Sequence, residues 1–482
     1  MRVAVVGGGV AGLAAARALA AAGHAVTLLE RDAVLGGKIR TARSGGFLVE
    51  SGPDSFLAAK PSAIALCREV GLGGEIVSAR EPRRVAVYAA GALHPLPDGV
   101  RLVPTRLMPI LRSSLFTAVE KARIAADLVL PARPPAGDES VGSLIRRRLG
   151  RAALDRLVAP LIGGIYGADP EQLSAEATFP HLCRAERDHG SLIRGARAAM
   201  DAADADDADT GNAAGAAAPT ARSPFVTLAG GMGSLIERVA ETLAGHDLRK
   251  SAAVARLARS GAGYRLDLED GTAVEAEGVV LAAPAMEAAR ILTRLAPTAA
   301  SLLAGIEHVS TAVVSLGFKA GDLPTLDGHG FVVARDQPSP ITACTWSSSK
   351  WPDRAPPHCA LLRAYLGSAV APVDLEQPDE RLVAAARDGI ARTMGVAAEP
   401  VIARVHRWPA AMPQYAVGHR DRVARIEAEV AGFPRLALAG AAYDGVGIPD
   451  AIASGLSAAR RVAGSSRAAG EPNDPGDSRV VS

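Results

Sequence analysis

The first thirty residues of this chain run as strand, glycine turn, helix, strand and acidic residue. An apolar run at residues 3–6 leads into the motif Gly7-x-Gly9-x-x-Gly12, and an alanine-rich stretch with helical character follows. Gly7 permits a tight turn, Gly9 lets the backbone approach a pyrophosphate, and Gly12 allows helix and strand to pack closely. The anion would lie on the helix N-terminus, where backbone N–H groups are free. The N-terminus therefore predicts a dinucleotide-binding unit.

Further glycine segments favour FAD over NAD as the dinucleotide. The second apolar run ends in Glu30, whose carboxylate can accept hydrogen bonds from an adenosine ribose. Gly36-Gly37-Lys38 and Gly52-Pro53-Asp54-Ser55 then offer more places for the backbone to approach a ligand. A nicotinamide cofactor leaves after each turnover and is commonly held by one such unit, whereas FAD stays bound along more of the chain. A plain loop at Gly36-Gly37 is the alternative.

Length, charge and cysteine spacing exclude several classes of protein. A chain of 482 residues exceeds the usual size of one hydrophobic core, so two or three domains are expected. The formal net charge of +2 argues against nucleic-acid binding. The four cysteines form no Cys-x-x-Cys pair, so no metal site or redox dithiol is expected. The N-terminus lacks a signal-peptide pattern and no charge-free run of about 20 apolar residues occurs, which predicts a cytoplasmic protein without a membrane span.

The pattern predicts an α/β protein with an FAD-binding, Rossmann-like domain and a mixed-sheet substrate domain. The FAD-binding domain is expected from residues 1–80, 225–300 and 405–463, and the substrate domain from residues 81–100 and 301–404. Strand-like runs in the substrate domain precede a helix at about 379–394, and Asp270-Gly271 is a hairpin signal within the FAD-binding domain.

Three further segments complete the expected organisation. Residues 101–200 form a helical subdomain, in which basic and apolar residues interleave from 115 to 130. That segment suits either a membrane surface or an amphipathic core helix. Residues 201–224 are expected as a flexible insertion because they are acidic, alanine-rich and without large apolar side chains from 201 to 223. Residues 464–482 are expected as a disordered tail.

The C-terminal part contains a second glycine-rich segment. An apolar run at 436–439 ends in Gly440, and Gly445-Val446-Gly447-Ile448-Pro449-Asp450 opens a helix of small residues. Proline in the first turn pre-sets the start of that helix. Its N-terminus offers N–H groups and a partial positive charge, as the pyrimidine side of a reduced, anionic flavin requires. The two ends of the chain are therefore expected to hold one flavin.

The chain resembles the protoporphyrinogen oxidase family of flavoproteins over residues 1 to about 463. The motifs that carry the resemblance lie at residues 36–38, 52–57, 160–170 and 445–450. Residues 341–346, 350–352 and 412–415 are most similar to the Gram-positive branch of the family. Members of that branch oxidise coproporphyrinogen III, which carries four propionates, to coproporphyrin III for haem synthesis.

The resemblance implies two sets of site residues. Lys60 and Tyr365 match the substrate pocket, with a surface lysine and a packed tyrosine as the alternatives. Val254 would meet the adenine through its backbone, and Trp408 would lie near the flavin. The residues implied for FAD are Gly7, Gly8, Gly9, Val10, Ala11, Gly12, Glu30, Arg31, Gly37, Lys38, Gly52, Pro53, Asp54, Ser55, Val254, Trp408, Gly440, Gly447, Ile448 and Pro449.

The implied reaction removes six electrons from the porphyrinogen in three rounds, each ended by dioxygen with release of hydrogen peroxide. The flavin carries the chemistry, so no catalytic acid or base is named. Basic side chains are expected around the pocket for the propionates, the candidates being Lys60, Arg83, Arg84, Lys350 and Arg363. Expected partners are the porphyrinogen, dioxygen and the next haem-pathway enzyme, and a peripheral contact with the inner face of the membrane is left open.

Other functions remain open at this point. One is a protoporphyrinogen IX oxidase, whose substrate has two vinyl groups in place of two propionates. Another is a flavin amine oxidase or a carotenoid desaturase on the same scaffold, although Gly440-Ala441-Ala442 and the segment at 445–450 argue against an amine oxidase. The last is a non-catalytic flavin-binding or haem-chaperone module.

Overall fold

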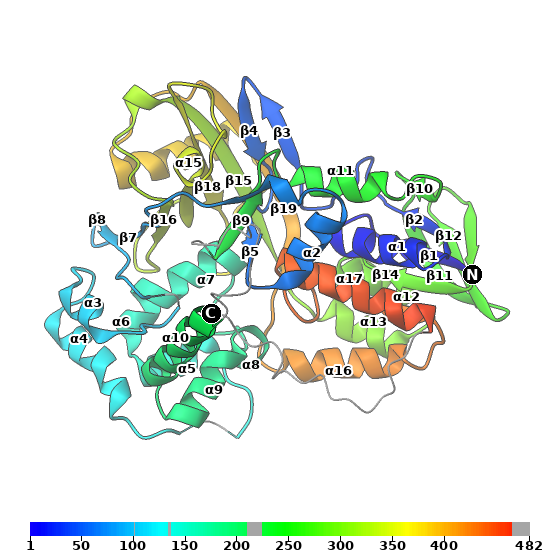
Figure 1. The fold of residues 1–482 in the computed structure, drawn as a ribbon, viewed down its shortest axis with the longest axis horizontal. Coiled ribbons are helices and arrows are strands. Elements are labelled where there is room, and N and C mark those ends of the chain that lie inside the picture. The colour runs from blue at the N-terminus through cyan, green and yellow to red at the C-terminus, as the bar shows by residue number, and fades with distance from the viewer. Residues whose placement is uncertain (101, 134–135, 210–223, 465–482) are drawn as a thin grey trace.

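The computed structural model describes residues 1–100, 102–133, 136–209 and 224–464. They form three regions: a nucleotide-binding domain, a domain built on a seven-stranded sheet, and a helical subdomain (Figure 1). Within these ranges, no helix combines the length and the apolar character needed to cross a membrane.

The nucleotide-binding domain is centred on a five-stranded parallel sheet that both ends of the chain build. Its first strand lies in the middle and pairs with strands from the second apolar run and from the middle of the chain. In sheet order, the strands are β10 (Asp247–Arg249), β2 (Ala25–Leu29), β1 (Arg2–Val6), β14 (Gly278–Leu281) and β20 (Leu436–Leu438).

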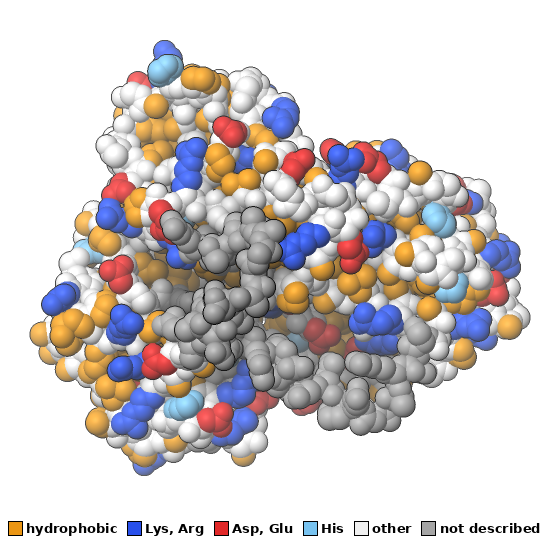
Figure 2. Space-filling view, viewed as in Figure 1, with side chains coloured by type: hydrophobic (Ala, Val, Ile, Leu, Met, Phe, Trp, Pro, Cys, Tyr) orange, Lys and Arg blue, Asp and Glu red, His pale blue; other side chains and the backbone are white. Residues whose placement is uncertain are grey.

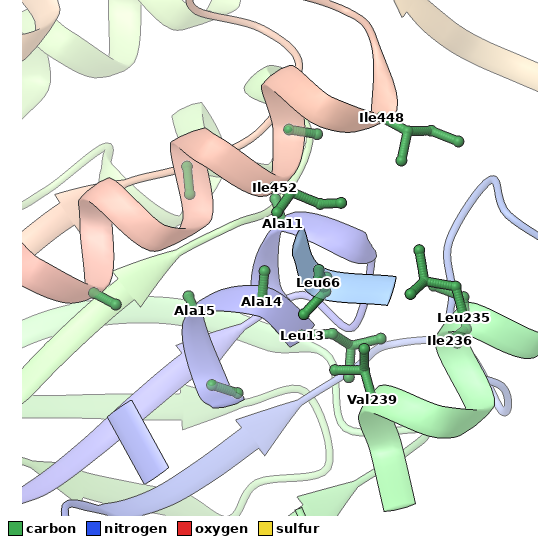
Figure 3. Close-up of a cluster of buried hydrophobic side chains, with 14 of the residues drawn as sticks. Ala11, Leu13, Ala14, Ala15, Leu66, Leu235, Ile236, Val239, Ile448 and Ile452 are labelled. Atoms are coloured by element: carbon green, nitrogen blue, oxygen red, sulfur yellow. The ribbon is translucent and has the colours of Figure 1, made fainter. Parts of the chain in front are cut away.

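Four helices cover one face of this sheet around a common apolar cluster (Figure 3). The first and last of them pack very closely, because a Cβ atom on Gly455 would lie 2.1 Å from the carbonyl oxygen of Ala11. The helices are α1 (Val10–Ala21), α2 (Pro61–Glu69), α11 (Gly233–Glu241) and α17 (Ile448–Ala463). Close packing of α1 on α17 brings the two predicted glycine-rich segments into one domain.

An antiparallel sheet and three helices cover the other face and share a second apolar cluster. The sheet consists of β11 (Val254–Ser260), β12 (Gly263–Leu268) and β13 (Ala273–Ala276). The helices are α12 (Ala285–Leu292), α13 (Pro297–Ala304) and α16 (His419–Val430).

The second domain is a mixed seven-stranded sheet with α15 (Asp379–Met394) packed against it. One pair of strands, β16 and β7, is parallel and the other pairs are antiparallel. In sheet order, the strands are β19 (Ile402–Pro413), β15 (His308–Lys319), β18 (Cys359–Leu366), β17 (Ala343–Trp346), β16 (Gly330–Val333), β7 (Val85–Ala89) and β8 (Ala92–Pro95).

Several short elements lie outside the two large sheets and the helical subdomain. The hairpin of β3 and β4 follows the first glycine-rich unit, and a three-stranded sheet joins β5, β9 and β6. These elements are β3 (Thr41–Ser44), β4 (Phe47–Glu50), β5 (Phe56–Leu57), β6 (Ile76–Ser78), β9 (Phe225–Leu228), α14 (Ser347–Lys350) and the 3-10 turns η1 (Gly73–Glu75) and η4 (Ala320–Asp322).

The helical subdomain shares an apolar cluster with the edge of the seven-stranded sheet that contains β7, β16 and β17, and it also contains a buried ion pair. Arg148 donates to Asp127 at 2.7 Å, and neither side chain is more than 2% exposed. The elements are α3 (Leu107–Arg112), α4 (Ala118–Ala125), η2 (Ala126–Leu128), α5 (Val141–Arg148), α6 (Arg151–Ala153), the π-turn η3 (Leu154–Val158), α7 (Ala159–Tyr166), α8 (Ala175–Thr178), α9 (Pro180–His189) and α10 (Leu192–Asp209).

The structure corrects two expected boundaries. Residues 405–413 do not belong to the nucleotide-binding sheet, because β19 pairs with β15 along almost its whole length. Residues 201–209 are not part of a loop, since α10 continues to Asp209. Alanine is the best helix former, and extension of an existing helix is easier than nucleation of a new one. The rest of the expected insertion, 210–223, and of the expected tail, 465–482, lies outside the described residues.

Candidate functional site

The first glycine turn leaves an open space at the N-terminus of α1. Gly7 has φ +107°, and a Cβ atom on it would lie 2.6 Å from the carbonyl oxygen of Ala282. On Gly12, a Cβ atom would lie 1.9 Å from the carbonyl oxygen of Gly7. On Gly9 it would meet nothing within 4 Å, and no side chain caps the helix there. The free N–H groups of the first turn therefore face room for an anion.

Glu30 lies at the edge of that space with its carboxylate fixed by the backbone. Its two oxygens accept hydrogen bonds from the Gly8 N–H at 2.5 Å and the Asp32 N–H at 2.8 Å, and the residue is 7% exposed. The neighbouring Arg31 points outward and pairs with Glu287 of α12 at 3.1 Å. The structure thus brings Glu30, but not the Arg31 side chain, into the turn of β1 and α1.

Val254 starts the strand that runs beside Glu30. The backbone N–H of Ala252, two residues earlier, donates to the carbonyl oxygen of Glu30 at 2.8 Å. The carbonyl oxygen of Val254 accepts from Arg290 of α12 at 2.8 Å. Arg290 was not expected from the sequence, because an exposed helical arginine carries no local signal of a backbone contact.

Three separate segments meet at Gly52. A Cβ atom on Gly52 would lie 2.0 Å from the carbonyl oxygen of Lys38 and 3.6 Å from the ring of Trp408. The Trp408 indole N–H donates to the carbonyl oxygen of Ser51 at 2.7 Å. Lys38 donates through Nζ to the carbonyl oxygen of Ala411, and burial lowers the pKa of Lys38 to about 8. The predicted cofactor residues Lys38, Gly52 and Trp408 are therefore neighbours.

A bulge in β19 lies beside Trp408. The pairing of β15 with β19 shifts register between Val309 and Thr311, and Ala410 has φ +44°. The Ala410 N–H donates to the hydroxyl of Ser310 at 2.9 Å. Bulges re-aim side chains and are frequent beside binding sites, but this one has no glycine to mark it in the sequence.

Asp54 is the centre of a buried polar cluster. It accepts from the Ser55 hydroxyl at 2.7 Å and from the Trp351 indole at 3.1 Å. Lys350 and Arg363 each approach its carboxylate to 3.4 Å. Burial alone would raise the pKa of Asp54, but Lys350 and then Arg363 hold it well below its usual range. Asp54 therefore stays ionised at neutral pH.

Arg363 connects this loop to the seven-stranded sheet. The residue is 1% exposed on β18, donates through Nη2 to the carbonyl oxygen of Gly52, and lies over the ring of Tyr365 at 5.4 Å. Its Nε and Nη1 have no hydrogen-bond partner among the described residues. The Tyr365 hydroxyl lies 3.3 Å from that of Thr345, and burial raises the Tyr365 pKa.

The start of α17 is held against α2. Lys60 forms an ion pair with Asp450 at 2.6 Å, and the hydroxyl of Ser62 donates to the carbonyl oxygen of Pro449 at 2.6 Å. Cβ atoms on Gly445 and Gly447 would lie 2.5 and 2.8 Å from the Asp450 side chain. Asp450 thus occupies the space that these two glycines leave, and Gly447 caps α17 without a side-chain hydrogen bond.

All five basic side chains expected at the substrate pocket have carboxylate partners. Lys60 pairs with Asp450, and Lys350 and Arg363 share Asp54. Arg83 and Arg84 are exposed and pair with Glu81 and Asp327. The structure therefore groups Lys350 and Arg363 with the predicted cofactor segment at 52–55, whereas Arg83 and Arg84 make no ion pair with that segment among the described residues.

The residues present fit a flavin dinucleotide. An uncapped helix start lies open at Gly9, a buried carboxylate lies beside it at Glu30, and a second uncapped helix starts after Gly447. At Gly440, φ is +126° and a Cβ atom would meet nothing within 4 Å. The arrangement offers a pyrophosphate site at one end and backbone N–H groups for a planar, electron-accepting ring at the other.

Comparisons with known proteins agree with a flavin cofactor. A family model described as flavin containing amine oxidoreductase matches residues 10–463. The chain is 39% identical over 480 residues to the coproporphyrinogen III oxidase of Propionibacterium freudenreichii, covering 95% of this chain and 90% of that protein. It is 35% identical over 465 residues to the coproporphyrinogen III oxidase of Bacillus subtilis strain 168, covering 95% of this chain and 96% of that protein.

A solved structure is similar over the same length. The protein from Exiguobacterium sp. 255-15, described as a protoporphyrinogen oxidase, superposes with a TM-score of 0.84 at 34% sequence identity. The match covers 96% of this chain and 99% of that one. The similarity therefore extends over the nucleotide-binding domain, the seven-stranded sheet and the helical subdomain alike.

Proposed function

The chain belongs to the family of flavin-containing amine oxidoreductases, and from this premise we propose that it is an FAD-dependent oxidase that converts coproporphyrinogen III into coproporphyrin III. One observation carries the proposal above the others. Over nearly its whole length, the chain is 35% and 39% identical in sequence to two coproporphyrinogen III oxidases. Proteins at this level of sequence identity share their fold and cofactor. This favours a porphyrinogen over the amine or carotenoid substrates of other flavoenzymes with the same scaffold.

We propose specific roles for the residues of the cofactor site. The segment from Gly7 to Gly12, with Gly8, Val10 and Ala11 between, would hold the pyrophosphate on α1, and Glu30 the adenosine ribose. Lys38 and the segment from Gly52 to Ser55 would hold the middle of the cofactor. The flavin would lie between Trp408 and the start of α17 at Gly447, Ile448 and Pro449.

When bound, FAD supplies a two-electron acceptor. Coproporphyrinogen III loses six hydrogens to become coproporphyrin III, so three molecules of dioxygen become three of hydrogen peroxide. The residues of this chain bind and orient the cofactor and the substrate. Asp54, ionised and held by Lys350 and Arg363, keeps the 52–55 loop in one conformation. Proton loss from the pyrrole nitrogens can follow electron removal, so no side chain is assigned as acid or base.

The substrate carries four propionates, and basic side chains near the flavin segments would bind them. Lys60 is the best candidate because its side chain is 48% exposed next to the start of α17. Its present partner, Asp450, would exchange for a propionate. Tyr365 would contribute an aromatic face from β18, and Lys350, 15% exposed, a second cation. Charge-assisted contacts of this kind favour carboxylates over vinyl groups.

A peripheral contact with an anionic membrane surface is part of the proposal. Met108, Leu111, Val119 and Val129 in the helical subdomain are exposed, Val119 and Val129 by about 80%. Arg106 and Arg112 lie among them. Figure 2 shows apolar and basic side chains together over this subdomain. Such a surface suits a cytoplasmic protein that rests on the inner face of the membrane and passes its product to the next haem-pathway enzyme.

The test is a direct comparison of two substrates in air. Purified, FAD-loaded protein is offered coproporphyrinogen III and protoporphyrinogen IX side by side, and porphyrin fluorescence and peroxide are followed. We expect kcat/KM to favour coproporphyrinogen III by more than tenfold. Turnover of neither substrate would overturn the proposal.

Protoporphyrinogen IX oxidation is the second candidate. The description of the Exiguobacterium protein as a protoporphyrinogen oxidase favours it. A preference for protoporphyrinogen IX in the same experiment would establish it in place of the first. Vesicle co-sedimentation, with anionic and neutral lipids compared, separately tests the membrane contact.

A further inference from the structure

Two stacked aromatic rings hold the loop that leads into α17. The rings of Tyr415 and His419 are parallel within 11°, with centroids 4.0 Å apart, and both residues are buried. The Tyr415 hydroxyl donates to the carbonyl oxygen of Ala441 at 2.8 Å and accepts from the Gly445 N–H at 2.8 Å. The His419 Nε2 lies 3.1 Å from the carbonyl oxygen of Tyr443. Two side chains thus engage three backbone groups of residues 441–445.

The helical subdomain fixes the backbone that carries these rings. The Ser174 N–H donates to the carbonyl oxygen of Tyr415 at 2.7 Å, and the Gly418 N–H donates to Asp138 at 2.9 Å. The Val417 N–H donates to the carbonyl oxygen of Gln172 at 3.1 Å. Tyr415 is therefore a rigid connection between the helical subdomain and the 441–445 loop.

The loop ends at Gly445, three residues before Ile448, where α17 begins. Gly445 has φ +154° and packs against Asp450, so a displacement of the loop would carry the start of α17 with it. Burial raises the pKa of the Tyr415 phenol far above its usual value, so the hydroxyl keeps its proton and can serve both as donor and as acceptor.

We propose that Tyr415, supported by the stacked His419, is a positioning residue that sets the conformation of the 441–445 loop and through it the flavin-binding start of α17. The inference rests on the proposed function only in requiring that FAD binds there. It requires nothing of the substrate, so the two can fail separately.

Tyr443 provides a matched control on the same loop. It is 5% exposed, and its hydroxyl has no hydrogen-bond partner among the described residues. Tyr415→Phe and Tyr443→Phe each remove one buried phenol oxygen, but only the first breaks hydrogen bonds to the loop. We expect Tyr415→Phe to raise the FAD Kd of the apoprotein at least tenfold and to change the visible circular dichroism of the bound flavin. Tyr443→Phe should stay within twofold of the unaltered protein.

Each outcome decides the proposal without any porphyrinogen present. An FAD Kd for Tyr415→Phe within twofold of that for Tyr443→Phe, whether both are unchanged or both raised, overturns it. Should Tyr415→Phe fail to fold, hydrogen exchange of the unaltered protein serves instead. FAD is then expected to protect residues 412–419 together with 440–449, and protection confined to 440–449 overturns the proposal.

Discussion

Lys60 and Asp450 lie 390 residues apart in the chain and form an ion pair of 2.6 Å between the residue that precedes α2 and the first turn of α17. Both flank the place where the flavin ring is proposed to lie. The pair shows that Lys60 can bind a carboxylate at this place. A substrate propionate that reaches Lys60 would replace the Asp450 carboxylate. Exposed ion pairs contribute little to stability, so the exchange of Asp450 for a propionate should cost little free energy.

Replacement of Lys60 by Ala tests this exchange. We expect KM for coproporphyrinogen III to rise by an amount equivalent to about 1–3 kcal/mol, with FAD content unchanged. Arg17→Ala is the matched control, since Arg17 pairs with Glu69 of the same helix α2 at 2.6 Å. Steady-state kinetics that show equal KM values for the two variants would remove Lys60 from the substrate site.

The same added methyl group should have different effects at Gly9 and at Gly12: weaker FAD binding at the first and lower stability of the apoprotein at the second. Ala at position 9 meets nothing within 4 Å and keeps an ordinary φ of −71°, so the apoprotein should melt at an unchanged temperature. The methyl group would, however, enter the space proposed for the pyrophosphate, and the FAD Kd should rise at least tenfold. Ala at position 12 collides with the carbonyl oxygen of Gly7 and should destabilise the apoprotein itself. Unchanged FAD binding by Gly9→Ala would contradict the proposed pyrophosphate site.

The lowered pKa of Lys38 predicts that cofactor binding depends on pH. Its pKa is lowered to about 8 by burial, so the amine of the apoprotein is partly neutral above that pH. The negative charge of FAD would raise this pKa again, and binding would take up a proton. Affinity for FAD should therefore fall as pH rises from about 7 to about 9, by at most about tenfold per unit.

Lys38→Arg is the control for this dependence, because arginine stays charged throughout the range. Fluorescence titration of FAD into the apoprotein measures both profiles. The slope should disappear in the variant, and parallel profiles would show that Lys38 is not its source.

Arg363→Met should destabilise the protein through Asp54. The change leaves a buried carboxylate with one cation instead of two, which we expect to cost about 3 kcal/mol in the free energy of unfolding at neutral pH. Arg363→Lys, which keeps the charge, should cost less. Because the pKa of Asp54 is held below its ordinary 3.8, this stabilisation is present above about pH 4 and is lost as pH falls through the lower, folded-state pKa. Urea denaturation should thus show a deficit that shrinks in acid, and a constant deficit would assign the effect to packing.

Several elements could be predicted because their signals are local. The β1–α1–β2 unit, the turn at Asp270-Gly271 between β12 and β13, and the helix at 379–394 are confirmed. The apolar run at 273–283 predicts a single strand, and this prediction is wrong, since the run splits into β13 and β14 of two different sheets. Sequence periodicity reports which residues are buried, but not against which sheet.

The amino-acid sequence alone determined the dinucleotide unit, because strand, glycine turn and helix follow one another within a few residues. Short contiguous motifs at 36–38, 52–57, 160–170 and 445–450 in the same way indicated the FAD-binding class and the family. Only the tertiary structure decided that β19 joins the second sheet and that Ala410 forms a bulge beside Trp408. The same is true of the ion pairs of Asp54 with Lys350 and Arg363. These relationships depend on strand pairing and ion pairs between residues that are 85 to 309 positions apart in the chain. Ion pairs and hydrogen bonds at that separation leave no pattern along the chain, since each partner alone has the composition of an ordinary surface or core residue.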